Sequence, residues 1–66
     1  MSSALKNPEL VEHLDLEKKG LKEIPPEIAQ LKNLKILELE GNYITTLPDF
    51  LWELTELEWI DLDHNR

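Results

Sequence analysis

The sequence contains no cysteine, so no disulfide can stabilise the fold, and the redox state of its compartment cannot be read from it. Glycine is scarce: Gly20 and Gly41 are the only two, which excludes a glycine-rich phosphate-binding loop. No apolar run reaches transmembrane length, and the opening "MSSALKNPEL" lacks the basic start and apolar centre of a signal peptide. The sequence therefore predicts a soluble chain without an export signal, and it leaves the compartment unknown.

Positive charge is also in short supply. Seven Lys and Arg residues stand against 14 Asp and Glu residues, which gives a formal net charge of −7 at pH 7 and a sequence pI of about 4.6. Nucleic acids and anionic membrane surfaces both favour Lys and Arg, so the composition argues against both as partners. The charge balance favours a neutral or basic protein partner.

The rest of the composition is that of a small folded domain. The 66 residues are 41% hydrophobic and 32% charged, which is ordinary for a globular chain and too apolar for a disordered tail. A chain of this length supports one small core. We expect a single module over residues 1–66.

The chain repeats itself. Residues 11–33 align with residues 34–56, and residues 57–66 begin a third copy. The offset is constant, since 34 − 11 and 57 − 34 both equal 23. Apolar residues and prolines recur in the aligned columns, as in Val11, Leu34 and Leu57. This organisation predicts two complete repeats and the strand of a truncated third, preceded by an N-terminal cap over residues 1–10.

The repeats resemble those of a known family. "LKILELEGNYI" meets the consensus L-x-x-L-x-L-x-x-N-x-L, and "LEWIDLDHN" meets it as far as it goes, so the chain resembles leucine-rich repeat proteins with short bacterial-type repeats. The resemblance implies an α/β solenoid with short parallel β-strands on the concave face and short helical turns on the convex face. Lys19 departs from the consensus, because the other two units carry Asn42 and Asn65 at that position.

Local patterns agree with such a solenoid. Alternating residues predict three short strands with leucines facing inward and carboxylates facing outward: Leu14-Asp15-Leu16, Leu37-Glu38-Leu39 and Ile60-Asp61-Leu62. Pro25 and Pro48 suit the first turn of a short helix. Asn42 and Asn65 can both donate and accept, so we expect them to bond the backbone of their turns. Lys19 can only donate, so the first turn should lack this bond.

The two ends of the solenoid differ. At the N-terminus, Ser2 or Ser3 can cap a short helix that Asn7-Pro8 ends. The C-terminal end has no cap, so one strand edge and the following inward residues should lie open as a self-association edge: Leu54, Leu57, Ile60 and Leu62. Two explanations stay open, a natural or engineered fragment of a longer solenoid and a chain whose open edge is closed by another copy in a homo-oligomer.

Candidate binding residues lie on the outward strand positions. They form two ladders of carboxylates, Asp15, Glu38 and Asp61 in one, and Glu17, Glu40 and Asp63 in the other. Beside the ladders, Ile36 precedes Trp59 in an apolar column. Acids and an exposed aromatic residue suit a Lys- or Arg-bearing protein surface, with Trp59 as an anchor. Alternatively, the acids are a solvated face and Trp59 covers Ile36. Trp52 is expected to cover the core from outside, or else to contribute to self-association.

Catalysis finds no support in the sequence. The carboxylates face outward from an open sheet, whereas acid–base chemistry needs a buried carboxyl and a substrate pocket. His13 and His64 fall in different columns, so they do not form a shared metal site, and no cofactor is expected. The sequence thus predicts a protein-binding scaffold that uses an acidic concave face, with a self-assembling building block as the alternative.

Overall fold

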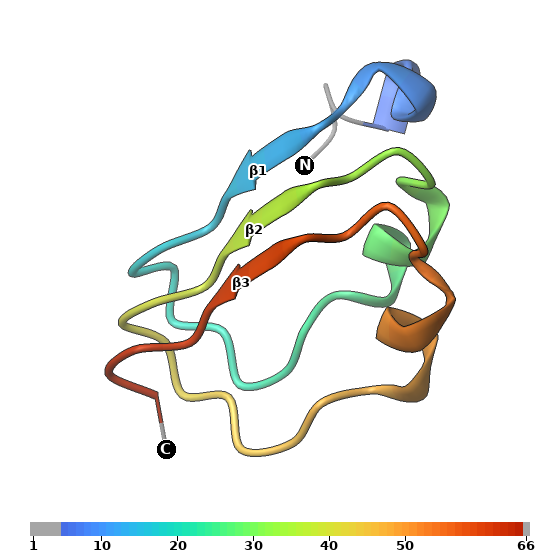
Figure 1. Cartoon of the computed structure of the whole chain (residues 1–66). Helices are drawn as coiled ribbons and strands as arrows, with labels where there is room; N and C mark the ends of the chain where they lie inside the picture. Colours follow the sequence, from blue (N-terminus) through green and yellow to red (C-terminus); the bar gives the residue numbers. More distant parts are fainter. Residues whose placement is uncertain (1–4, 66) are drawn as a thin grey trace.

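The computed structural model describes residues 5–65. Its elements in chain order are η1 (Pro8–Leu10), β1 (His13–Asp15), η2 (Pro26–Gln30), β2 (Ile36–Glu38), η3 (Asp49–Glu53) and β3 (Trp59–Asp61), where η denotes a 3-10 helix. The three strands form one parallel sheet in the order β1-β2-β3. Figure 1 shows the strands side by side, with the chain making one circuit between each strand and the next.

The register of the sheet equals the period of the sequence. His13 pairs with Ile36, and Ile36 pairs with Trp59, so each partner lies one repeat further along the chain. We call residues 11–33, 34–56 and 57–65 the first, second and third rungs. Successive units therefore stack in register, and equivalent residues lie next to each other.

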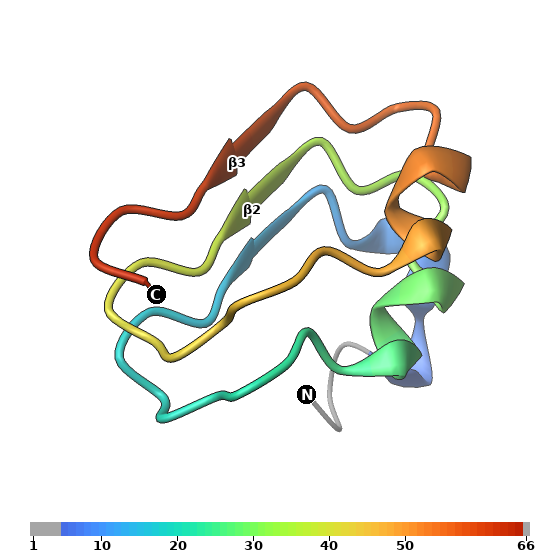
Figure 2. The same ribbon diagram turned by 90° about the horizontal axis from the view of Figure 1, so that it is seen from below.

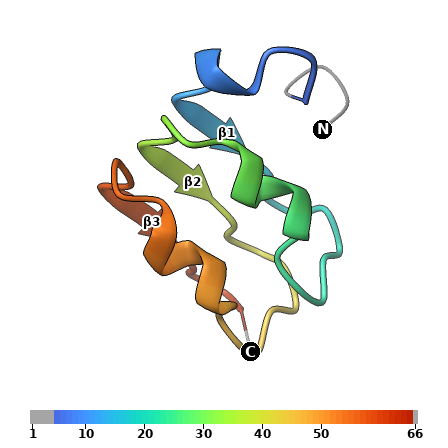
Figure 3. The same ribbon diagram turned by 90° about the vertical axis from the view of Figure 1, so that its right-hand side faces the viewer.

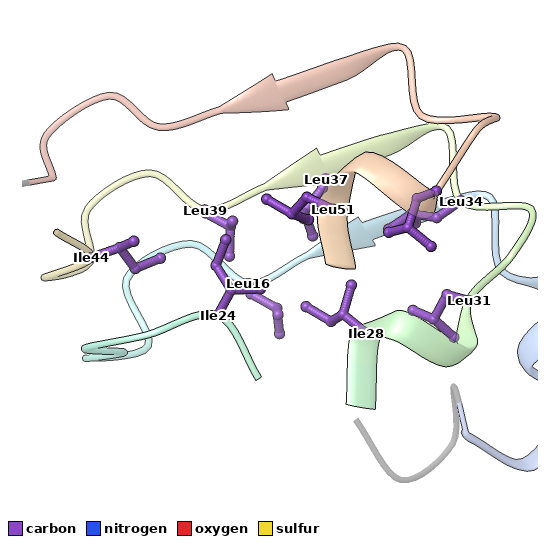
Figure 4. Packing of buried hydrophobic residues seen from close by; sticks show 10 residues of the cluster. Leu16, Ile24, Ile28, Leu31, Leu34, Leu37, Leu39, Ile44 and Leu51 are labelled. Carbon is purple, nitrogen blue, oxygen red and sulfur yellow. The ribbon is translucent and has the colours of Figure 1, made fainter. Parts of the chain in front are cut away.

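Two layers enclose the core. Figure 2 shows the strands on one side and the returning segments on the other, with the 3-10 helices closing one end. The labelled leucines and isoleucines in Figure 4 lie between these layers. Leu34, Leu37 and Leu39 of the second rung are completely buried, because a rung covers them on each side. The structure thus confirms the predicted inward face of β2.

The third rung is less well covered. Leu57, Ile60 and Leu62 pack against the core but are only half-buried, and their role as a self-association edge stays a prediction. Leu54 differs from the expectation, because it is only 3% exposed and belongs to the core. The 3-10 helix that precedes it turns both Leu51 and Leu54 inward.

The helical segments begin where the prolines predict. Pro25 is the N-cap of η2 and Pro48 the N-cap of η3, and the two helices lie side by side in Figure 3. Ile28 and Leu51 point from them into the core and are buried. Trp52 is 69% exposed and is not among the residues that pack against the core, so the expectation that it covers the core is wrong, whereas its contribution to self-association stays a prediction.

The turns after the strands share one strained position. Lys18, Gly41 and His64 occupy the same column and have φ values of 53°, 73° and 60°. Residues with side chains seldom adopt this left-handed conformation, whereas glycine does so readily. Gly41 is also constrained by space, because a Cβ atom there would lie 2.8 Å from Lys18 Cγ. The backbone of the second turn therefore favours glycine on both counts.

Asn42 joins two rungs. It is 2% exposed and bonds the backbone as predicted, because its Nδ2 donates to Leu39 O of its own rung at 2.8 Å and to Leu16 O of the first rung at 3.0 Å. Its Oδ1 accepts from the N–H groups of Lys19 and Leu21, both at 3.0 Å. The expectation that the first turn lacks an asparagine–backbone bond is wrong, because Asn42 of the second rung hydrogen-bonds backbone groups of the first. A lysine is tolerated at position 19 because the bonds of the first turn come from Asn42.

Asn65 repeats this arrangement one rung later. Its Nδ2 donates to Leu62 O at 3.1 Å and to Leu39 O at 2.8 Å, and its Oδ1 accepts from Ile44 N at 2.9 Å. Leu39 O consequently accepts from both asparagines. The amides therefore link successive turns across the stack.

At the N-terminus, the predicted capping residues Ser2 and Ser3 lie outside the described residues. Leu5 and Lys6 are helical and the helix ends before Asn7, as Asn7-Pro8 predicts, and Pro8 then begins η1. Asn33 Nδ2 donates to Glu9 O at 2.8 Å, which ties η1 to the chain that leads into β2. The N-terminal cap itself stays a prediction. No helix in the described part of the chain is long and apolar enough to cross a membrane.

Candidate protein-interaction surface

The outward side of the sheet carries the six predicted carboxylates, which we call the acidic sheet face. Strand alternation turns them away from the core. Asp15, Glu17 and Asp63 are exposed, whereas Glu38, Glu40 and Asp61 are half-buried. The stacking of the rungs thus brings all six onto one surface, as the repeat predicts.

Two aspartates of this face are held by the backbone. Asp15 Oδ1 accepts from Glu17 N, and Asp61 Oδ1 accepts from Asp63 N, both at 3.0 Å. Each bond joins a side chain to the N–H group of the next residue but one and fixes the side chain at the end of its strand. The ends of the first ladder are therefore positioned by local turns.

Glu38 lies between these aspartates and has a basic neighbour. Its Oε2 bonds His13 Nε2 from β1. Sequence reasoning treated His13 only as a candidate metal ligand and missed this pair. The signal was present in the repeat, because His13 is opposite Ile36 in the register and thus diagonally adjacent to Glu38. One acid of the first ladder therefore has a hydrogen-bond partner on the neighbouring strand.

Glu40 has acidic neighbours instead of a basic one. Its Oε1 is buried and has no hydrogen-bond partner among the described residues. Burial, followed by the charges of Asp61 and Glu17, raises the pKa of Glu40 from 4.5 to about 7. Asp61 belongs to the other ladder, so the two ladders form one electrostatic cluster. Near neutral pH, Glu40 is the carboxyl that a nearby cation would stabilise most.

The apolar part of the surface lies beside the acids. Ile36 is half-buried, and Trp59, its partner in the register, is 62% exposed. Next to Ile36 in the chain, Lys35 places its Nζ 3.9 Å from Glu12 Oε1 in an exposed ion pair. A large aromatic side chain therefore stands at the border of the acidic sheet face.

A groove that the sequence did not reveal opens where the second rung leads into the third. Trp52 and Trp59 both border it, although one lies on η3 and the other on β3. The lining residues are Leu51, Trp52, Leu54, Thr55, Leu57, Glu58, Trp59 and Ile60. The two tryptophans fall in different columns of the repeat, and no sequence motif pairs them. Only the folded chain brings them to one groove.

The two histidines have different neighbours. His13 is on β1 beside Glu38, whereas His64 lines a hollow with Glu17 and Glu40. Within residues 5–65, no three His, Asp or Glu side chains come together in a way that could hold a metal ion.

Comparisons with known proteins agree with the geometry. The family model described as "Leucine rich repeat" matches residues 9–66. A leucine-rich repeat protein structure from Leptospira interrogans is 45% identical, with a TM-score of 0.87 over 98% of this chain and 17% of that chain. Disease resistance protein RFL1 of Arabidopsis thaliana is 44% identical over 54 residues, or 80% of this chain and 6% of that protein.

A further relative is leucine-rich repeat serine/threonine-protein kinase 1 of Mus musculus, 38% identical over 79% of this chain and 3% of that protein. The chain thus spans a small part of the relatives it matches. Leucine-rich repeats generally mediate protein–protein interaction and are in general non-enzymatic. The repeat period, the parallel register, the asparagine bonds and the family match together show that the chain belongs to the leucine-rich repeat family.

Proposed function

We propose that this chain is a non-catalytic binding module whose acidic sheet face receives a basic protein segment. The observation that carries the proposal is Glu40, whose buried Oε1 has no hydrogen-bond partner within residues 5–65 and whose carboxyl lies between the charges of Glu17 and Asp61. A Lys or Arg side chain of a partner would supply the missing charge. Such an arrangement costs folding stability, which is common where a surface is kept for binding.

Trp59 gives the same surface an apolar anchor. Binding energy usually concentrates in aromatic residues surrounded by polar groups, and Trp59 with Ile36 has that setting beside the carboxylates. The partner segment therefore has an apolar side chain flanked by Lys or Arg. The acidic field speeds its association at low salt.

Titration calorimetry with a synthetic peptide of lysines flanking a leucine pair tests this proposal. The variant Glu38→Gln, Glu40→Gln, Asp61→Asn removes three charges from the acidic sheet face. If each pair contributes about 0.5 kcal/mol, the affinity falls about tenfold. Binding of the unchanged chain should also weaken as salt rises.

A matched variant controls for net charge. Glu27→Gln, Asp49→Asn, Glu53→Gln removes three exposed carboxylates from η2 and η3 and leaves the sheet untouched. We expect it to retain the affinity of the unchanged chain to within about twofold, since its charges lie away from the bound peptide. Equal losses in both triple variants would show that the peptide responds only to overall charge and would overturn the proposal.

A further inference from the structure

Three carboxyl groups from three rungs form one cluster on the acidic sheet face. Glu40 belongs to the second rung, and its carboxyl is influenced by the charges of Glu17 from the first rung and Asp61 from the third. Oε1 of Glu40 is buried and has no hydrogen-bond partner within residues 5–65. In the same part of the chain, none of the three carboxylates takes part in an ion pair. The described residues therefore leave the negative charge of the cluster unbalanced.

The other outward acid of the second rung has a different setting. Glu38 bonds His13 Nε2 from the neighbouring strand. Glu40 instead borders a hollow of about 500 Å³ that Lys18 and His64 also line. Neither of these two basic side chains pairs with Glu40 in the part of the chain that the structure describes. The hollow thus leaves room beside Glu40 for a cation from another molecule.

Acids predominate among the charged groups around Glu40. Four of its neighbours are acidic and two are basic, and they come from all three rungs: Glu17, Lys18, Glu38, Asp61, Asp63 and His64. Burial, then the charges of Asp61 and Glu17, and then hydrogen bonding to these two side chains raise the pKa of Glu40 to about 7. A proton relieves the repulsion by removing one charge, whereas a cation relieves it by balancing that charge. The two solutions exclude each other at one carboxyl.

We propose that a proton and a basic side chain of the partner compete for this carboxyl cluster, so that the acidic sheet face holds its partner at neutral pH and above and releases it in a mildly acidic medium. The inference rests on the proposed function and adds the regulation of that site. A protonated Glu40 presents a neutral carboxyl where Lys or Arg needs a carboxylate. A partner that binds the ionised form therefore expels the proton, and a falling pH weakens the partner to the same extent.

The size of the effect follows from the protonation of Glu40 in the free and bound chain. The pKa of Glu40 is about 7 in the free chain, and a bound cation would return it toward the ordinary value of 4.5. With these two values, the dissociation constant of the partner rises about tenfold between pH 8 and pH 6. At pH 7, about half a proton leaves for each peptide bound, because about half of the free chains carry the proton.

Titration calorimetry at about pH 8 and pH 6 tests the proposal, with the peptide of lysines flanking a leucine pair acetylated at its N-terminus. Acetylation removes the one group of the peptide that titrates near this range, because lysine side chains titrate near pH 10. At pH 7, two buffers with different enthalpies of ionisation give the number of protons released. We expect the unchanged chain to show the tenfold rise and the release of about half a proton.

Glu40→Gln is the decisive variant. Its side chain has nearly the same shape but cannot ionise, so the competition between proton and peptide disappears. We expect this variant to bind the peptide more weakly than the unchanged chain at pH 8. Its dissociation constants at pH 8 and pH 6 should agree to within about twofold, since only ordinary histidine titration remains.

Two controls separate Glu40 from its neighbours. Glu38→Gln removes a carboxylate of the same rung, so it should weaken binding at both pH values and keep the tenfold ratio. His13→Gln, His64→Asn removes the two side chains whose ordinary titration falls between about pH 5 and 8. Asparagine suits position 64, because it tolerates the positive φ of that residue. This double variant should also keep the tenfold ratio.

The possible failures are distinguishable. Equal affinity of the unchanged chain at pH 8 and pH 6 would overturn the inference and leave the proposed function standing. A tenfold ratio that persists in Glu40→Gln and disappears in the double histidine variant would also overturn it, because the histidines would then be the groups that respond to pH. Absence of binding at both pH values would overturn the proposed function, and the inference with it.

Discussion

Replacement of Asn42 by alanine tests the bonds that join the rungs. The change removes the acceptor of the Lys19 and Leu21 N–H groups and the donor of the Leu16 and Leu39 carbonyls. Leu39 O keeps its bond from Asn65, so three groups are left without their partner. An unpaired buried polar group costs roughly 1–3 kcal/mol, so these three together cost about 4 kcal/mol. Water can reach the two partly buried N–H groups, which lowers the expected loss to about 3 kcal/mol.

That loss is large for a chain of this size. Stabilities of roughly 0.05–0.15 kcal/mol per residue give this chain a free energy of unfolding of about 3–10 kcal/mol. A loss of about 3 kcal/mol would lower the melting temperature by about 15 °C, at about 4–8 °C per kcal/mol for small domains. Urea denaturation followed by circular dichroism measures the free energy directly, and a thermal melt gives the temperature shift.

Three other alanine variants serve as controls. Asn65→Ala should cost about half as much, because its bonds are less buried. Asn33 makes an exposed hydrogen bond to Glu9 O, and Lys19 contributes only its backbone N–H group. Asn33→Ala and Lys19→Ala should therefore each lower the free energy of unfolding by under about 0.5 kcal/mol. Equal losses in Asn33→Ala and Asn42→Ala would refute the reasoning.

Three further changes test other parts of the structure. Because the pKa of Glu40 is raised, the fold should be more stable below pH 4.5 and lose stability as pH rises through about 7. Glu40→Gln should remove this loss in thermal melts at low salt. A variant with the same pH profile as the unchanged chain would contradict the assignment to Glu40. Gly41→Ala should lower the free energy of unfolding, measured by urea denaturation, more than Gly20→Ala does. Both glycines have positive φ, but only a methyl group at position 41 would collide with Lys18. Equal losses would show that Lys18 simply moves aside. Leu37→Ala should lower the free energy of unfolding by about 3 kcal/mol through a core cavity, and a loss below about 1 kcal/mol would mean that the site collapses.

The repeat made much of the fold predictable. Its constant period predicts which residues become neighbours, and the register from His13 to Ile36 to Trp59 follows from it. The burial of the inward leucines and the start of η2 and η3 at prolines could also be predicted, because each of these residues recurs in a fixed column of the repeat. Asn42 was correctly expected to bond the backbone, because its side-chain amide can both donate and accept.

What the sequence did not reveal depends on contacts between rungs. The direction of the Asn42 bonds, back to the first rung, cannot be seen in a single repeat. Burial of Glu40 depends on how three side chains from three rungs share one space. Trp52 was misjudged because its column is occupied by Ala29 in the unit before, which carries no information about the direction of a large side chain.

The most direct test of the proposed binding surface is NMR chemical-shift mapping of the complete chain with the lysine–leucine peptide at low salt. The account predicts the largest changes at Ile36, Glu40 and Trp59, with the side-chain carboxyl of Glu40 losing its proton at neutral pH as the peptide binds. Residues of η2 and η3 should remain unchanged. Changes centred on η2 and η3, with the sheet unaffected, would contradict the claim that the acidic sheet face is the binding site.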